Sequence, residues 1–206
     1  MKQFVITIGR QLGCGGKEIA EKLAAELGVK VYDKALLQAA ACESGIDASL
    51  FERADESESN SLFGGFFSIH GSMSEYFSGS SCIDNDSLFE IQSEAIRNIA
   101  QNESCIIVGR CAEYVLRDHP AMFSIFLTAD HNDRVERIMR AESLERDAAV
   151  EFIEKNDKKR RSYHDYYATI RWGEASSYDL CVNMSRLGID GTVELIKQYL
   201  AARLAK

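Results

Sequence analysis

Short apolar runs alternate with amphipathic segments along most of the chain. Five runs are typical of buried strands: residues 4–8, 29–32, 105–108, 122–127 and 178–183. Helical patterns occupy residues 17–28, 34–42, 86–100, 130–141 and 191–205. Strands that alternate with helices predict a parallel sheet with helices on both faces.

Two segments depart from this pattern. Residues 56–87 are rich in Ser, Gly and Asn, which predicts a mobile insertion. The segment also holds several aromatic side chains, so we expect it to pack against another surface. We place the insertion at about 44–87 and a helical lid at about 142–170. With 206 residues, 46% of them hydrophobic, the chain is expected to form a single domain, 1–206, that carries both segments.

The net charge of −8 argues against a general nucleic-acid binder, which needs a surplus of Lys and Arg. No apolar stretch reaches the roughly eighteen residues that span a bilayer, and residues 1–4 do not resemble a signal peptide. We therefore expect a cytoplasmic protein with no membrane partner. The six cysteines are scattered and include no CxxC pair, which favours free thiols over a zinc or redox site.

Chemistry-bearing residues follow three of the predicted strands. In a parallel sheet, the segments 9–17, 33–34 and 109–110 should face one crevice. The glycine-rich turn at 9–17 leads from a strand into a helix, an arrangement that lets backbone N–H groups approach phosphate. Its spacing differs from the standard phosphate loop, G-x-x-x-x-G-K-[ST], so a simple tight turn stays open as the alternative.

Arginine is the second signal. Arg110 follows a fully apolar strand, where its guanidinium can grip a phosphate bidentately, although a surface arginine is the plainer interpretation. Residues 155–161 hold five basic side chains among seven. Such a run is either a solvated helix face or a lid that brings positive charge onto a transferring phosphoryl group.

These residues resemble the cytidylate-kinase-like family of bacterial proteins. The segments that carry the resemblance are ITIGRQLGCGGKEIA at 6–20, YDK at 32–34, VGRCA at 108–112, and residues 160–167. The resemblance runs nearly end to end and is weakest over 44–87. It implies an α/β, three-layer P-loop kinase-like fold with a parallel five-stranded sheet, a helical acceptor-binding insertion and a helical lid.

The resemblance also implies site residues. The ATP phosphates would be held by Gly13, Cys14, Gly15, Gly16, Lys17 and Glu18. Arg110 would hold the acceptor phosphate, as the arginine of the Gly-Arg-Asp motif does in cytidylate kinase, and Asp33 would also lie at the acceptor. Lys17, Arg160 and Arg161 would be catalytic, and Mg²⁺ would rely on water, phosphate oxygens and Asp33.

Three departures from the family pattern matter. Gly16 stands at the lysine position, Glu18 at the hydroxyl position, and Cys111 replaces the aspartate of Gly-Arg-Asp. Our leading hypothesis is ATP- and Mg²⁺-dependent phosphoryl transfer to CMP or dCMP. The alternatives are a kinase of another small-molecule acceptor and a nucleotide-binding regulatory protein with little turnover. The oligomeric state stays open.

Overall fold

The structure, a computed structural model, describes residues 2–35, 37 and 85–205. The chain divides into two compact units, one made of Met1–Lys34 with Ile96–Lys206 and the other of Ala35–Ala95. Helix α4 (Asn85–Asn102) begins in the second unit and ends in the first. The predicted insertion at 44–87 and most of the predicted helix at 34–42 lie outside the described residues.

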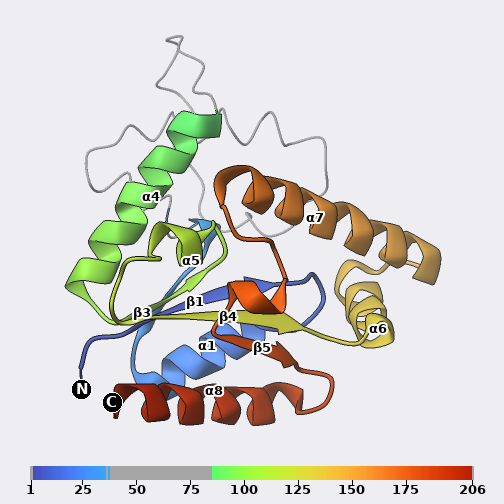
Figure 1. Cartoon of the computed structure of the whole chain (residues 1–206). Coiled ribbons are helices and arrows are strands. Elements are labelled where there is room, and N and C mark those ends of the chain that lie inside the picture. The colour runs from blue at the N-terminus through green and yellow to red at the C-terminus, as the bar shows by residue number, and fades with distance from the viewer. Residues whose placement is uncertain (1, 36, 38–84, 206) are drawn as a thin grey trace, which may run out of the picture. The chain divides into compact units, whose positions relative to one another are not determined.

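Five parallel strands form one sheet in the order β2-β3-β1-β4-β5 (Figure 1). Their bounds are β1 Val5–Arg10, β2 Lys30–Tyr32, β3 Cys105–Val108, β4 Met122–Thr128 and β5 Leu180–Asn183. The predicted parallel sheet is therefore confirmed. β5 begins two residues later than expected because Tyr178 instead ends a short 3-10 turn at Ala175–Ser177, labelled η1.

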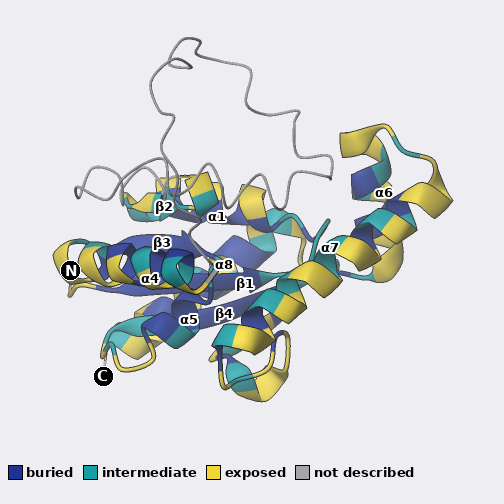
Figure 2. Cartoon of the chain, turned by 90° about the horizontal axis from the view of Figure 1, so that it is seen from above, coloured by how far each residue is buried: buried dark blue, intermediate teal, exposed yellow. Residues whose placement is uncertain are grey.

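The register of the central strands positions the site. β1 lies between β3 and β4, with Ile8 opposite Val108 on one side and Ile125 on the other. The residues that follow Ile8 and Val108 thus lie side by side at the carboxyl edge of the sheet, where Gly9 and Arg10 still pair with β4. Figure 2 shows that these central strands are buried, which explains their unbroken apolar sequences.

Helices cover the two faces of the sheet. α1 (Gly16–Leu27) and α8 (Gly188–Leu204) pack together beneath it in Figure 1, around a core that includes Ile19, Leu23 and Ile196. The short helix α5 (Ala112–Val115), which the sequence pattern did not predict, packs against β1 and β4 on the other face. The predicted two-sided architecture is confirmed in this unit.

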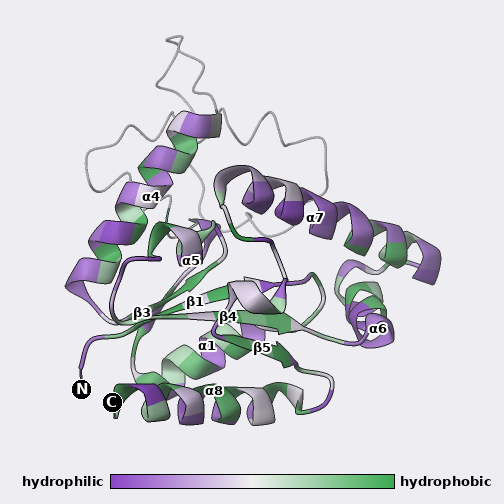
Figure 3. Cartoon of the chain, viewed as in Figure 1, coloured by the Kyte–Doolittle hydropathy of each residue, from purple (hydrophilic) through white to green (hydrophobic). Residues whose placement is uncertain are grey.

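Helices α6 (His131–Glu142) and α7 (Arg146–Tyr167) follow β4 along the chain and pack against each other. α7 falls inside the segment predicted as a lid, and Figure 3 shows that it is mostly hydrophilic. A small apolar cluster joins the two helices through Val135, Ile138, Ala149 and Ile153. The pair thus has its own core, separate from the main core beneath the sheet.

The described cysteines, Cys14, Cys105, Cys111 and Cys181, are free thiols, as predicted, and Cys42 and Cys82 lie outside the described residues. None of the helices within the described ranges is long and apolar enough to cross a bilayer.

Candidate active site

The glycine-rich turn between β1 and α1 presents its backbone closely to whatever binds there. Gly13 and Gly15 have φ values of 77° and 71°, a left-handed conformation that favours glycine. A Cβ atom on Gly13 would lie 2.8 Å from the carbonyl oxygen of Arg134, so no side chain fits. Gly15 is the N-cap of α1, and no described side chain caps this helix. The free helix start favours an anion.

The loop is fastened to both α6 and α7. The N–H of Leu12 donates to Oδ1 of Asp157 at 2.8 Å, and Nε of Arg134 donates to the Leu12 carbonyl at 2.7 Å. Arg134 and Asp157 also form an ion pair with each other, with side-chain exposures of only 8% and 15%. Sequence reasoning did not assign these two residues to the site. They hold the loop backbone between two helices.

Three arginines meet beside this loop. Arg10, the last residue of β1, lies so close to Gly109 that a Cβ there would be 2.1 Å from Nη1 of Arg10. Nη1 of Arg160, from α7, donates to the carbonyl of Arg10 at 3.2 Å. Arg110 follows Gly109 and is close enough to Arg10 to affect its pKa. We call Arg10, Arg110 and Arg160 the arginine cluster.

The arginine cluster carries positive charge that nearby acidic groups offset only in part. Burial, followed by repulsion from Arg160 and then Arg110, lowers the pKa of Arg10 to about 9, and attraction from Asp33 opposes this only in part. Burial likewise lowers the pKa of Arg160. Among the described residues, none of the three arginines forms an ion pair with a carboxylate. An anion of several charges would relieve this repulsion.

Arg110 lies in a strained turn that follows β3 and fixes the direction of its side chain. Gly109, Arg110 and Cys111 have successive φ values of 79°, 58° and 54°, all left-handed. Such backbone costs about 1–2 kcal/mol per non-glycine residue. The guanidinium of Arg110 lies over the ring of Tyr163 from α7, 5.4 Å from its centre. Strain of this kind clusters at functional positions, which supports the sequence-based choice of Arg110.

Lys17 and Glu18, the charged residues predicted in the first turn of α1, both form ion pairs with other side chains. Lys17 is 67% exposed, and its Nζ lies 3.8 Å from Glu21, one turn further along the helix. Glu18 lies 3.2 Å from Arg137 of α6. Cys14 is buried, and burial raises the pKa of its thiol, so the residue contributes backbone rather than charge. The predicted roles of Lys17 and Glu18 on phosphate stay predictions.

Asp33 follows β2 at the same edge of the sheet and attracts Arg10 electrostatically. It is an exposed carboxylate. No group of three or more His, Cys, Asp or Glu residues within the described ranges is arranged to hold a metal ion. Mg²⁺ commonly keeps several waters and takes only one or two carboxylates, and the predicted role of Asp33 toward it stays a prediction.

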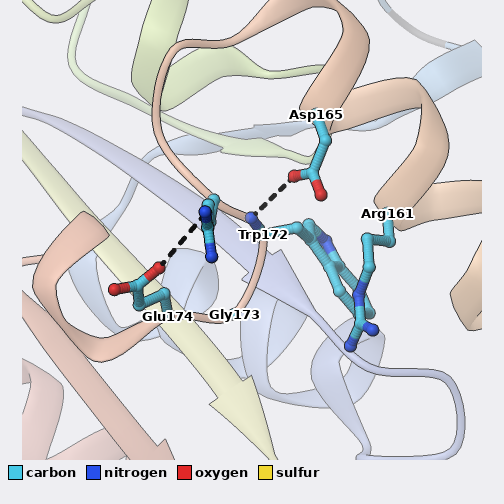
Figure 4. A pocket seen from close by; sticks show the side chains of 6 residues that line it. Arg161, Asp165, Trp172, Gly173 and Glu174 are labelled. Atoms are coloured by element: carbon cyan, nitrogen blue, oxygen red, sulfur yellow. Dashed lines mark hydrogen bonds and ion pairs between the residues drawn. The ribbon is translucent and has the colours of Figure 1, made fainter.

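The two predicted lid arginines diverge. Arg160 lies at the loop, whereas Arg161 stacks over the ring of Trp172, with its guanidinium carbon 5.6 Å from the ring centre. A pocket of about 360 Å³ opens here, as Figure 4 shows. It is lined by Arg161, Asp165, Arg171, Trp172, Gly173 and Glu174. The structure therefore brings one of the two arginines to the glycine loop.

A buried charged network connects α7 to the turn that carries Arg110. Nε2 of His164 lies 2.8 Å from Glu113 of α5, and Nδ1 lies 3.1 Å from Asp165. Burial alone would lower the pKa of His164, but the two carboxylates outweigh it and raise that pKa. His164 and Glu113 were not singled out from the sequence, although His164 lies in the segment 160–167 that carries the family resemblance. They couple α7 to the Arg110 turn.

Comparison with known families identifies the family to which the chain belongs. The model of the cytidylate kinase-like family matches residues 5–186, which include the glycine loop, the Arg110 turn and α7. The chain belongs to the cytidylate kinase-like family. The predicted resemblance is thereby confirmed.

Solved structures agree on the fold. An uncharacterised protein from Eubacterium ventriosum is 28% identical, with a TM-score of 0.73, covering 97% of this chain and 99% of that one. A shikimate kinase from Bacteroides thetaiotaomicron is 15% identical, with a TM-score of 0.55 and coverages of 96% and 98%. A shikimate kinase from Acinetobacter baumannii bound to shikimate is 9% identical, also with a TM-score of 0.55, with coverages of 100% and 97%. A comparison with curated proteins found no match. The P-loop kinase fold is confirmed.

Proposed function

We propose that this protein transfers the γ-phosphoryl group of ATP to a nucleoside monophosphate, with CMP or dCMP as the acceptor. The observation that carries the proposal is the arginine cluster beside an uncapped helix start, where the backbone of Gly13 and Gly15 can approach phosphate closely. Membership of a kinase-like family supports phosphoryl transfer in particular.

In this proposal the loop backbone binds the ATP phosphates. The amides of residues 13–18 and the start of α1 supply the dipoles. Asp33 would contact Mg²⁺ through water, and the bound ion would neutralise phosphate charge. Lys17 would add its charge only from the exposed side of α1. Asp157 and Arg134 hold the loop in place for this role.

The acceptor phosphate is assigned to Arg110. Its guanidinium can form two parallel hydrogen bonds to phosphate, and the left-handed turn and the Tyr163 ring fix its direction. Arg160 neutralises charge that develops on the transferring group, and Arg161 contributes from the neighbouring Trp172 pocket. Because positioning and charge neutralisation carry this chemistry, no side chain needs to act as a general base.

One observation favours a second candidate, a kinase of another small-molecule acceptor. Cys111 replaces the aspartate that follows the arginine in cytidylate kinase, and its side chain is buried. Burial raises the pKa of its thiol, so Cys111 stays neutral and supplies no carboxylate to orient a nucleotide. The acceptor is then selected by other groups.

An acceptor panel tests the proposal. ATP consumption would be measured with each nucleoside monophosphate, with the matching deoxynucleotides, and with shikimate as a hydroxylated acceptor that is not a nucleotide. We expect CMP or dCMP to give the highest kcat/KM. A higher kcat/KM for a non-nucleotide acceptor would support the second candidate, and tight ATP binding with no turnover on any acceptor would contradict both and favour a regulatory protein.

A further inference from the structure

Position 16 is the first residue of α1. When residues are counted from Ile8 without gaps, this position corresponds to the lysine of the standard phosphate loop, and here it is glycine. The space that a side chain at this position would enter is filled. A Cβ on Gly16 would lie 3.2 Å from both Cβ and Cγ of Arg10. The aliphatic stem of Arg10 therefore passes directly over Gly16.

The other end of the Arg10 side chain meets a second glycine. A Cβ on Gly109 would overlap Nη1 of Arg10, so the end of the arginine side chain would have to shift to admit one. Gly16 and Gly109 are far apart in sequence, yet both leave room for the same arginine. Arg10 thus reaches from the start of α1 to the turn that carries Arg110.

Lys17 cannot take the same path. One residue further along a helix, a side chain is rotated by about 100°. Lys17 accordingly lies on the exposed side of α1, where it pairs with Glu21 at 3.8 Å. Arg10 is the cation that faces position 16.

We propose that Arg10 supplies, from the end of β1, the positive charge that the loop lacks at Gly16, and that its guanidinium binds the β- and γ-phosphates of the nucleoside triphosphate. This inference rests on the proposed function, which assigns ATP to the loop. The absence of an ion pair to Arg10 among the described residues supports it, because a phosphate would supply the missing counter-charge.

Calorimetric titration with ATP and with inorganic tripolyphosphate, each with Mg²⁺, tests this assignment. Arg10→Met keeps the aliphatic stem over Gly16 and removes the charge. We expect it to weaken binding of both ligands at least about tenfold, the loss expected for one charge-assisted hydrogen bond. Arg117→Ala is the matched control, because Arg117 is 54% exposed and precedes β4 at the opposite edge of the sheet.

A charge swap separates the guanidinium's role from packing. Arg10→Ala removes the side chain that crowds Gly16, and adding Gly16→Lys returns a cation from the standard position. We expect the double variant to bind ATP at least fivefold more tightly than Arg10→Ala alone, by the same reasoning on charge-assisted bonds. Gly16→Lys alone should bind no better than wild type, because Arg10 occupies the space.

The outcomes distinguish this inference from the proposed function. Wild-type affinity in folded Arg10→Met, or a double variant no tighter than Arg10→Ala, would overturn the role of Arg10. Arg10-dependent binding of tripolyphosphate without phosphoryl transfer to any acceptor would support that role and contradict the proposed function. Wild-type protein that binds neither ligand would overturn both. The melting temperature of Arg10→Met confirms folding, and it should not fall, because a repelled buried charge is removed.

Discussion

The carboxylate of Asp157 accepts a hydrogen bond from the backbone N–H of Leu12 at 2.8 Å, which joins α7 to the glycine loop. Asp157 is the single acidic residue in the basic run 155–161. The same carboxylate pairs with Arg134, which in turn holds the Leu12 carbonyl. The basic run is thus anchored by its one acidic residue, and this anchor places Arg160 at the loop.

Asp157→Asn tests the anchor. It keeps a side-chain oxygen for Leu12 but leaves the mostly buried Arg134 without its counter-charge, so we expect a loss of about 3 kcal/mol in unfolding free energy. Urea denaturation measures it. Glu151→Gln, an exposed change on the same helix, should shift the free energy by less than about 0.5 kcal/mol. Equal effects of the two variants would contradict the anchor.

Replacing Arg110 by lysine tests its assignment to the acceptor. Lysine keeps the charge but loses the bidentate geometry, so we expect the KM of the acceptor to rise about tenfold or more while the KM of ATP stays near wild type. Steady-state kinetics with each substrate varied in turn measures both constants. An unchanged acceptor KM would remove Arg110 from the acceptor site.

The two arginines of α7 should differ in effect. Arg160 lies on the loop, so Arg160→Ala should lower kcat about a hundredfold or more with little change in ATP affinity. Arg161→Ala should lower kcat less, because that side chain lies over Trp172. Single-turnover rates of phosphoryl transfer in the two variants measure this difference. Rates within about twofold of wild type for both variants would show a solvated helix face instead.

Gly15 and Gly28 form a matched pair for testing the loop. Both have positive φ, at 71° and 68°, so alanine strains the backbone similarly at either end of α1. Only Gly15 lies in the loop, and we expect Gly15→Ala to weaken ATP binding more than Gly28→Ala or Lys17→Ala does. Calorimetry measures the three affinities. The loop assignment fails if Lys17→Ala alone abolishes binding.

The His164 network predicts a pH dependence of stability. The folded pKa of His164 is raised above its ordinary value of 6.5, so the network stabilises the protein fully below about pH 6.5 and loses this contribution as the pH rises through the folded pKa. Melting temperatures from about pH 6 to about pH 9 should fall more steeply for wild type than for His164→Gln. Parallel curves would show that His164 carries no linked proton.

Much of the sheet was predictable because its strands are buried on both sides and therefore read as unbroken apolar runs, such as Cys105–Val108. The four residues of α5 are too few to show a helical period. The loop glycines and Arg110 lie in local motifs and were found. Arg10 was missed as a site residue because its surroundings depend on Gly109, which only the pairing of β1 with β3 brings close.

The sequence also could not predict that Arg160 lies at the loop whereas Arg161 lies over Trp172. Adjacent helical residues face directions about 100° apart. Which of the two arginines lies at the loop depends on the orientation of α7 about its own axis, which the contact of Asp157 with Leu12 fixes. The network of Glu113 and His164 likewise joins residues fifty-one positions apart.

The central claim is tested most directly by following the γ-phosphoryl group itself. Wild-type protein would be incubated with ATP labelled at the γ-phosphate, Mg²⁺ and CMP, and the labelled products separated. The account predicts labelled CDP in many-fold molar excess over protein, with label transfer strongly reduced in Arg110→Lys and Arg160→Ala. Label that stays in ATP, or appears only in inorganic phosphate with every nucleoside monophosphate supplied, would contradict it.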